Sequence, residues 1–326
     1  MTHAVRIHET GGPEVLRWEA VDVPDPGRGE ALVRQTVAGL NFIDVYFRTG
    51  LYPAPSFPVT LGNEGAGVVE AVGDGVTEVA VGDRVVYCMN LGSYTQRRLV
   101  AATQLVRIPD GISDEQAAAV MLKGCTVQYL VRRTYAVQPG DTILFHAAAG
   151  GCGLIACQWL KHLGATVIGT VGTRAKAELA KAHGCDHPVV YTEESFVDRV
   201  RELTGGKGVP VVYDSVGRDT FNASLDCLQP RGLMVSFGNA SGAVEPFPPG
   251  VLAPKGSLYL TRPTLATYTA TRAELEATAA ELFDVVGRGV VRIEVNQTYE
   301  LANAAQAHRD LEARKTTGST VLLTGA

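Results

Sequence analysis

Residues 145–156 read Phe-His-Ala-Ala-Ala-Gly-Gly-Cys-Gly-Leu-Ile-Ala, and this stretch decides the fold. A run of apolar residues ends where this stretch begins, and a segment with helical character follows the stretch. On the dinucleotide-binding fingerprint G-x-G-x-x-G, Ala148 holds the first position, Gly150 the second and Gly153 the third. Gly150 lets the backbone approach a pyrophosphate, and Gly153 lets the helix lie close to its strand. The spacing and its context predict a dinucleotide-binding turn rather than only a tight strand–helix turn.

Strands and helices alternate around this turn, which is typical of a doubly wound parallel sheet. Continuously apolar runs such as residues 209–213 suit strands that are covered on both faces. Strands are predicted over residues 142–147, 166–170, 188–191, 209–214, 233–237 and 257–260. Helices are predicted to begin near Gly151, Arg174, Ser195 and Arg218.

The chain ends have a different pattern. Up to about residue 120, short alternating apolar runs are bounded by Gly, Pro and Asp, which predicts a barrel-like β fold. A helix is predicted from Ser113, interrupted at Gly124, with a second helix over 126–136. After Pro263 the pattern predicts an amphipathic helix, strands near 292–295 and 321–323, and a helix over 302–314. We therefore predict a β-rich domain from residues 1–124 and 264–326 and a nucleotide-binding domain over 125–263.

Composition excludes several classes of protein. The 326 residues are 46% hydrophobic and carry a net charge of −5, so a dedicated nucleic-acid binder is not expected. The N-terminus lacks the apolar centre of a secretion signal, and His146 and Gln158 interrupt the least polar stretch. We expect a cytoplasmic protein. No two of the six cysteines have the close spacing of a structural zinc site, and reduced, mostly buried thiols are expected.

The choice of cofactor depends on the strand after the glycine turn. Sites specific for NAD place an acid at its end, which bonds the ribose hydroxyls. Here residues 168–176 read Ile-Gly-Thr-Val-Gly-Thr-Arg-Ala-Lys, without an acid. Arg174 and Lys176 are able to neutralise the additional phosphate of NADP, so the sequence favours NADPH.

Two further segments carry a family resemblance. With the layout above, Gly-Asn-Glu-Gly-Ala-Gly at 62–67 and Gly-Asp-Arg-Val at 82–85 resemble the medium-chain dehydrogenase/reductase superfamily. Its zinc enzymes bind the metal through a Cys ahead of a Gly-His-Glu motif and through the His of that motif. Asn41 and Asn63 stand at these positions here, and amides are poor zinc ligands. We expect no catalytic metal.

The closer resemblance is to the quinone oxidoreductases, the ζ-crystallin-like group of that superfamily. Residues 41–52, 145–159, 212–220 and 233–242 carry it, and Cys152 departs from the apolar residue usual there. The resemblance implies a Rossmann-type sheet plus a GroES-like barrel domain, and a homodimer. It also implies metal-free hydride or electron transfer from NADPH to a quinone bound in the interdomain cleft.

The resemblance assigns site residues as well. The pyrophosphate would be held by Gly150, Gly151, Cys152 and Gly153, and the 2′-phosphate by Gly172, Thr173, Arg174, Lys176, Tyr191 and Arg314. Ser215, Val216, Gly238, Asn239 and Ser241 would line the path to the nicotinamide. The nicotinamide end of the cofactor would lie beside Asn41, Phe42, Ile43 and Tyr129. That end would be closed over by Pro263, Thr264 and Leu265. Tyr129 is equally compatible with ordinary helix packing.

Several interpretations remain open. Tyr46 and Tyr52, in the loop after Asn41, either bind or stack on a quinone or simply pack beside the prolines that follow. An enoyl-thioester reductase using one of these tyrosines as an acid, and an RNA-binding or crystallin-type role, are the alternative functions. His146 is expected to be buried and hydrogen-bonded, and Lys123 to make a structural pair. Residues 257–261 are either a dimer edge strand or a strand covered by its own helix.

Overall fold

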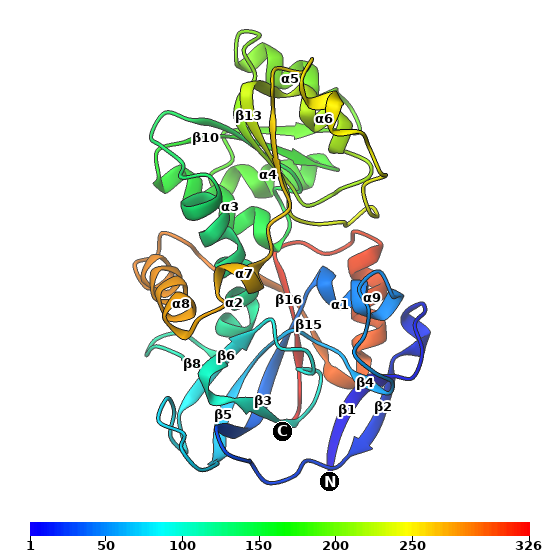
Figure 1. Ribbon diagram of the computed structural model, residues 1–326, viewed down its shortest axis with the longest axis vertical. Helices are drawn as coiled ribbons and strands as arrows, with labels where there is room; N and C mark the ends of the chain where they lie inside the picture. The colour runs from blue at the N-terminus through cyan, green and yellow to red at the C-terminus, as the bar shows by residue number, and fades with distance from the viewer. The chain divides into compact units, whose positions relative to one another are not determined.

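The computed structural model describes residues 1–326 and divides into two compact units (Figure 1). Unit 1 comprises Met1–Cys125, Thr269–Gly287 and Ile293–Ala326. Unit 2 comprises Thr126–Tyr268 and Arg288–Arg292. Helix α2 (Asp114–Tyr129) leads the chain from the first unit into the second. None of the helices combines the length and the apolarity needed to cross a membrane.

Unit 2 is built on a six-stranded parallel sheet in the order β11-β10-β9-β12-β13-β14. The first strand along the chain therefore lies inside the sheet, with later strands added on both sides, and the predicted doubly wound sheet is confirmed. The strands are β9 (Thr142–Phe145), β10 (Thr166–Val171), β11 (His187–Val190), β12 (Val209–Asp214), β13 (Leu228–Ser236) and β14 (Tyr259–Thr261). The helices are α3 (Gly151–His162), α4 (Arg174–Ala182), α5 (Phe196–Leu203), α6 (Phe221–Asp226) and α7 (Leu265–Tyr268).

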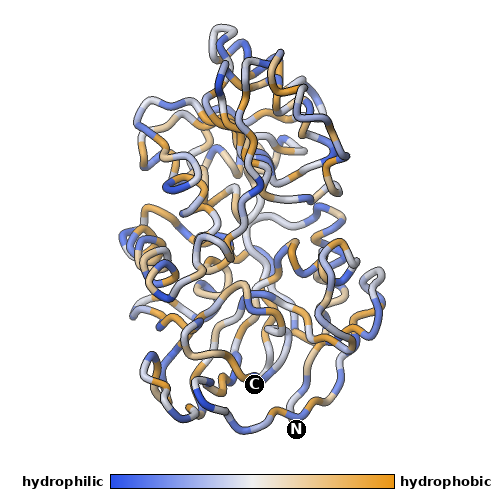
Figure 2. Tube along the Cα trace, viewed as in Figure 1, coloured by the Kyte–Doolittle hydropathy of each residue, from blue (hydrophilic) through white to orange (hydrophobic).

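Burial of the central strands explains their composition. Leu144, Ile168 and Val212, from three adjacent strands, are fully buried and belong to one hydrophobic core. Figure 2 shows apolar residues running along these strands. Because the strands are covered on both faces, they are continuously apolar instead of alternating.

Unit 1 is β-rich, as predicted, and contains two sheets. The larger sheet runs β15-β16-β3-β5-β6-β8, with β7 also paired to β3, and the smaller runs β2-β1-β4. The strands are β1 (Thr2–Ile7), β2 (Arg17–Val21), β3 (Glu30–Leu40), β4 (Val59–Thr60), β5 (Glu64–Val72), β6 (Arg84–Cys88), β7 (Arg97–Ala101), β8 (Val106–Arg107), β15 (Val295–Glu300) and β16 (Ser319–Leu323). Helices α1 (Phe42–Thr49), α8 (Arg272–Gly287) and α9 (Ala304–Glu312) complete the unit.

Three local predictions were wrong. Gly124 does not interrupt a helix, because α2 runs through it to Tyr129 and continues as a π-helical turn, Leu130–Thr134. A Cβ at Gly124 would lie 2.4 Å from Leu282 Cδ1 on α8, so this glycine serves close helix packing. Tyr46 lies on helix α1 and not in a loop. The strand predicted near 292–295 begins only at Val295, where pairing with β16 starts.

Candidate active site

The glycine turn of unit 2 follows β9 directly. A Cβ at Gly153 would lie 2.3 Å from the carbonyl oxygen of Ala147 and 2.6 Å from the carbonyl carbon of Ala148, so only glycine lets α3 lie this close. A Cβ at Gly150 would meet only the Ala147 oxygen, at 3.2 Å, which leaves its outer face open. Gly150 is the N-cap of α3 and no side chain caps the helix, and the N-terminus of a helix attracts anions.

At the end of β10, most of the residues predicted to bind the 2′-phosphate lie together, whereas Arg314 belongs to unit 1. The Thr173 hydroxyl caps α4 by accepting the N–H of Lys176 at 3.3 Å. A Cβ at Gly172 would lie 2.9 Å from Tyr191 Oη, so this tyrosine covers the glycine. Arg174 is 84% exposed and forms an ion pair with Glu193, Nη2 to Oε2, at 2.9 Å. This hydrogen bond lowers the pKa of Glu193, a residue that the sequence did not single out.

The end of β12 is organised by Asp214, which is fully buried. Its carboxylate accepts the N–H groups of Val216 and Gly217 at 2.8 and 3.0 Å, and the hydroxyl of Ser224 at 3.0 Å. Ser224 also bonds His146 Nε2 at 2.9 Å. The prediction for His146 is confirmed: it is fully buried and hydrogen-bonded, and burial lowers its pKa.

The loops after β12 and β13 contact each other, which brings together the residues predicted along the cofactor path. A Cβ at Gly238 would lie 2.5 Å from the carbonyl oxygen of Ser215. The N–H of Ser241 donates to the carbonyl of Val216 at 2.8 Å. Asn239 stands between these residues in the second loop. Pro263, Thr264 and Leu265 follow β14 and lead into α7.

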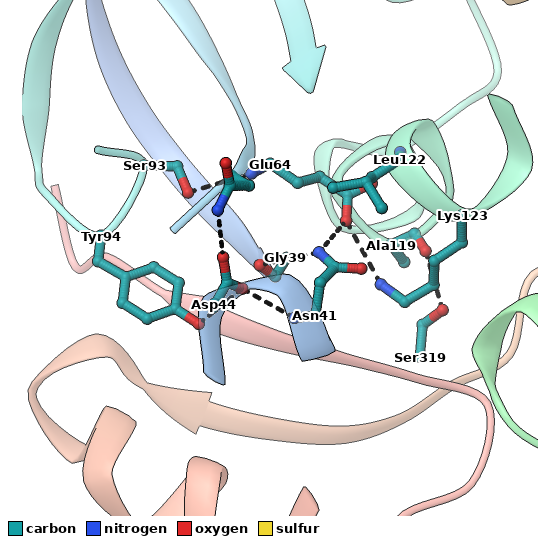
Figure 3. A network of polar contacts seen from close by, with 11 residues as sticks. Gly39, Asn41, Asp44, Glu64, Ser93, Tyr94, Ala119, Leu122, Lys123 and Ser319 are labelled. Atoms are coloured by element: carbon teal, nitrogen blue, oxygen red, sulfur yellow. Dashed lines mark hydrogen bonds and ion pairs between the residues drawn. The ribbon is translucent and has the colours of Figure 1, made fainter. Parts of the chain in front are cut away.

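Unit 1 contains a buried polar cluster around Asn41 (Figure 3). Asn41 Nδ2 donates to Glu64 Oε2 at 2.8 Å, and Lys123 Nζ lies 3.3 Å from the same oxygen. Glu64 Oε1 accepts the backbone N–H of Leu122, inside α2, at 2.6 Å. The Glu64 side chain is fully buried, and a Cβ at Gly39 would lie 2.3 Å from its Oε2. The predicted structural pair of Lys123 is therefore confirmed, with Glu64 as its partner.

Asp44 forms the second half of this cluster. It accepts hydrogen bonds from the Asn41 N–H at 2.9 Å, from Asn63 Nδ2 at 2.8 Å and from Tyr94 Oη at 3.1 Å. Burial raises the pKa of Asp44 to about 6, although these donors oppose the shift. Asn41 and Asn63 stand at the positions where zinc enzymes carry metal ligands, and the side-chain amide of each donates a hydrogen bond to a carboxylate. No group of three or more His, Cys, Asp or Glu side chains is arranged to hold a metal ion.

A chain of contacts leads from Asp44 to the surface of unit 1. Tyr94 Oη lies 3.2 Å from His308 Nε2, and Arg48 Nη1 lies 3.1 Å from His308 Nδ1. Arg48 is 1% exposed and pairs with Glu312 at 2.8 Å. Because arginine only donates, His308 Nδ1 accepts and Nε2 carries the proton. Burial and the Arg48 charge lower the pKa of His308 to about 3.

The remaining predicted residues divide between the units. In unit 1, the rings of Tyr46 and Tyr52 meet edge to face with centroids 5.2 Å apart, and Phe42 lies 6.3 Å from Tyr46. Ile43 follows Phe42 on α1. Arg314 lies just beyond α9, exposed, with φ at 57°. In unit 2, Tyr129 stacks on Tyr268 with centroids 4.4 Å apart.

Comparisons with known proteins agree with this architecture. Residues 27–110 match the alcohol dehydrogenase GroES-like domain family, and residues 151–284 match the zinc-binding dehydrogenase family. A GroES-like domain combined with a doubly wound sheet defines the class of medium-chain dehydrogenases/reductases.

Full-length relatives narrow the class. A quinone oxidoreductase of Pseudomonas aeruginosa is 56% identical, covering 99% of this chain and 100% of the relative. The crystal structure of Escherichia coli quinone oxidoreductase complexed with NADPH is 52% identical, with a TM-score of 0.97, covering 99% of this chain and 100% of that one. A 2-haloacrylate reductase of Burkholderia sp. is 47% identical, covering 99% of each chain. The chain belongs to the quinone oxidoreductase family, and it is an oxidoreductase.

Proposed function

We propose that this enzyme transfers a hydride or electrons from NADPH to a quinone. The observation that carries the proposal is full-length similarity, at 52–56% identity, to quinone oxidoreductases, one of which was crystallised with NADPH. The absence of an acid at the end of β10, with Arg174 and Lys176 just beyond it, supports NADPH over NADH.

The residues of unit 2 fit a dinucleotide phosphate. The uncapped first turn of α3 and the open face of Gly150 suit a pyrophosphate held by Gly150, Gly151, Cys152 and Gly153. Gly172, Thr173, Arg174, Lys176 and Tyr191 would bind the 2′-phosphate. Bound NADPH supplies the hydride, so the protein has to orient the reactants and exclude water. Ser215, Val216, Gly238, Asn239 and Ser241 would orient the cofactor, and Tyr129, Pro263, Thr264 and Leu265 would lie at its reactive end.

For the acceptor we propose the aromatic cluster of unit 1. Tyr46 and Tyr52 already form a ring contact, which suits stacking of a flat quinone, and their hydroxyls are able to donate to its oxygen. Asn41 is the N-cap of α1, the helix that carries Tyr46. A quinol oxygen is readily protonated from water, so a dedicated proton donor is not required.

The test measures oxidation of NADPH and NADH separately, with 1,4-benzoquinone and with 9,10-phenanthrenequinone. We expect fast oxidation of NADPH only. Tight binding of NADPH without turnover of either quinone would refute quinone reduction but would support the assignment of NADPH as the cofactor. Tyr46→Phe and Tyr52→Phe test the acceptor site: unchanged quinone kinetics in both variants would return these tyrosines to packing roles.

The Burkholderia relative favours a second candidate, reduction of an electron-poor carbon–carbon double bond conjugated to a carboxyl group. Both reactions deliver a hydride to a conjugated acceptor, so the same cofactor site serves either. Assays with 2-chloroacrylate and with crotonyl thioester, beside the quinones, separate them. A higher kcat/KM for either of these acceptors than for the quinones would replace the first candidate.

We also propose a cytoplasmic homodimer. β14 is the last strand of the sheet in unit 2, and its Tyr259 is 62% exposed, so a partner strand would cover this edge. The six cysteines are free thiols, four of them buried, which suits a reducing compartment. A monomeric mass by light scattering at micromolar concentration would exclude the dimer, and Tyr259→Asp should dissociate it.

A further inference from the structure

A buried row of polar side chains lies at the carboxyl edge of the sheet in unit 2. The row before it, aligned on three adjacent strands of one hydrophobic core, is apolar and fully buried: Leu144, Ile168 and Val212. Side chains two residues apart share a face of a strand, and two residues further along the chain the row is polar: His146, Thr170 and Asp214. These three are at most 2% exposed. The core of the sheet thus changes from apolar to polar where the strands end.

Hydrogen bonds join this row to Ser224 of α6 and run in one direction. Burial lowers the pKa of His146, so its ring is neutral and carries one proton. The Ser224 hydroxyl donates to Asp214 Oδ2 at 3.0 Å, so its oxygen accepts from His146 Nε2 at 2.9 Å. His146 Nδ1 then accepts the hydroxyl of Thr170 at 2.8 Å. We call Thr170, His146, Ser224 and Asp214 the buried polar network.

Both ends of this network contact segments that are proposed to bind NADPH. At one end, the N–H of Ala147 donates to Thr170 Oγ1 at 3.4 Å, at the start of the glycine turn. Ala147 has φ at 56°, a left-handed conformation that is uncommon for alanine, so this turn depends on contacts that hold it. At the other end, Asp214 Oδ1 accepts the N–H groups of Val216 and Gly217 at 2.8 and 3.0 Å.

We propose that the buried polar network consists of positioning residues, which hold the glycine turn and the loop after β12 in the arrangement that binds the dinucleotide. The proposal rests on the proposed function and needs only residues of unit 2. Buried hydrogen bonds add little net stability, because they replace bonds to water, but a fully satisfied network fixes the orientation of its members. An apolar row would fill the same space without linking the two segments. The network acts on the cofactor through the backbone that it holds.

Two substitutions at Thr170 separate hydrogen bonding from packing. Thr170→Val keeps the shape of the side chain and removes the hydroxyl, whereas Thr170→Ser keeps the hydroxyl and removes a methyl group. We expect Thr170→Val to raise the Kd for NADPH about tenfold, the equivalent of about one hydrogen bond, and Thr170→Ser to stay within about threefold of the wild type. Fluorescence titration measures both. Equal binding by the two variants, or weaker binding by Thr170→Ser, would overturn the proposal.

A matched pair of hydroxyls tests the other end of the network. Ser224→Ala removes a hydroxyl that makes two hydrogen bonds inside the network. Thr204→Val also removes two, to the Val200 carbonyl and from the Gly208 N–H, at the opposite end of β12. Both should lower the melting temperature, but only Ser224→Ala should speed hydrogen exchange in the loop after β12 and raise the Kd for NADPH, each about tenfold. If the two variants bind NADPH equally, the network only stabilises the fold and the proposal is overturned.

The direction of the hydrogen bonds is testable without a ligand. Nitrogen NMR should find the His146 ring neutral with its proton on Nε2. A proton on Nδ1 would break the path to Asp214 and overturn the proposal. None of these measurements involves a quinone, so a failed quinone assay leaves their result standing. A wild type that binds no NADPH would overturn the proposed cofactor, and the positioning role with it.

Discussion

The polar cluster of unit 1 and the glycine turn of unit 2 prepare their sites in opposite ways. Around Asn41 the site consists of charged and amide side chains that are buried away from water. Each forms a hydrogen bond or an ion pair with a partner of opposite polarity. At Gly150 and Gly153 it consists of bare backbone that needs empty space. In the first case the cost is desolvation, and in the second it is excluded volume. Removing polar side-chain atoms should therefore destabilise unit 1, whereas adding side-chain atoms at the glycines should destabilise unit 2.

The largest effect is expected for Asp44→Ala. The carboxylate is fully buried, and its loss leaves the Asn41 N–H, the Asn63 amide and the Tyr94 hydroxyl without their acceptor. Each unsatisfied buried donor costs about 1–3 kcal/mol, so the free energy of unfolding should fall by about 4 kcal/mol. Urea denaturation measures this change. Asp74→Ala, on an exposed turn, should stay within about 0.5 kcal/mol, and a similarly small loss at Asp44 would refute the desolvation account.

A smaller effect of the same origin depends on pH. Because the pKa of His308 falls from 6.5 to about 3 on folding, the unfolded chain binds the proton more tightly, and stability is lost as pH falls below 6.5. Asp44, with a pKa raised to about 6, acts in the opposite direction: its contribution is lost as pH rises from about 4 to 6. The two therefore partly cancel in the wild type.

Replacing the histidine separates these contributions. Between pH 6.5 and 4.5 the wild type should lose about 2 kcal/mol of stability relative to His308→Asn. Chemical denaturation of both proteins at several pH values measures the difference. A difference that stays constant over this range would mean that His308 is not held neutral by burial.

The same contrast decides what the sequence could reveal. Backbone sites leave a local trace, because the glycines of a turn are close in the chain, and Gly150 and Gly153 were predicted from their spacing and from their place between a strand and a helix. The polar cluster is assembled from residues 41, 44, 64, 94, 123 and 308, so no local pattern contains it. Lys123 was expected to pair, but its partner could not be named. Asp44, Tyr94 and His308 were missed.

Two weak signals were available in the sequence. An acid three residues after Asn41 is a helix-capping pattern, and it would have predicted α1 where a loop was expected. Gly39 lies inside a strand, where glycine often marks a close approach, and here that approach is by Glu64. Gly124 shows why such signals mislead. A glycine in a helix suggests an end, but this one makes room for a leucine of a distant helix.

For unit 2 the matching experiment adds one carbon at two glycines. Gly153→Ala meets backbone atoms at 2.3 and 2.6 Å, so strand and helix must separate, at about 1–3 kcal/mol of stability. NADPH binding should weaken about 30-fold with it. Gly150→Ala meets nothing closer than 3.2 Å, so it should keep its melting temperature and still bind NADPH less well. Fluorescence titration and thermal unfolding measure both. Equal stability of the two variants would refute the excluded-volume account.

The smallest effect is expected where unit 2 does use side chains, at Arg174. This guanidinium is paired with Glu193 at the surface, so binding of the 2′-phosphate has to compete with a carboxylate already in place. Arg174→Ala should raise the KM for NADPH about fivefold and leave that for NADH unchanged, whereas Glu193→Gln should lower it about twofold. Both changes should shrink in 0.5 M salt, since exposed charges are screened. If Glu193→Gln leaves the KM for NADPH unchanged while Arg174→Ala raises it, the pair does not compete with the phosphate. If neither variant changes it, Arg174 is a surface charge, and selectivity for NADPH lies with Lys176 and Tyr191.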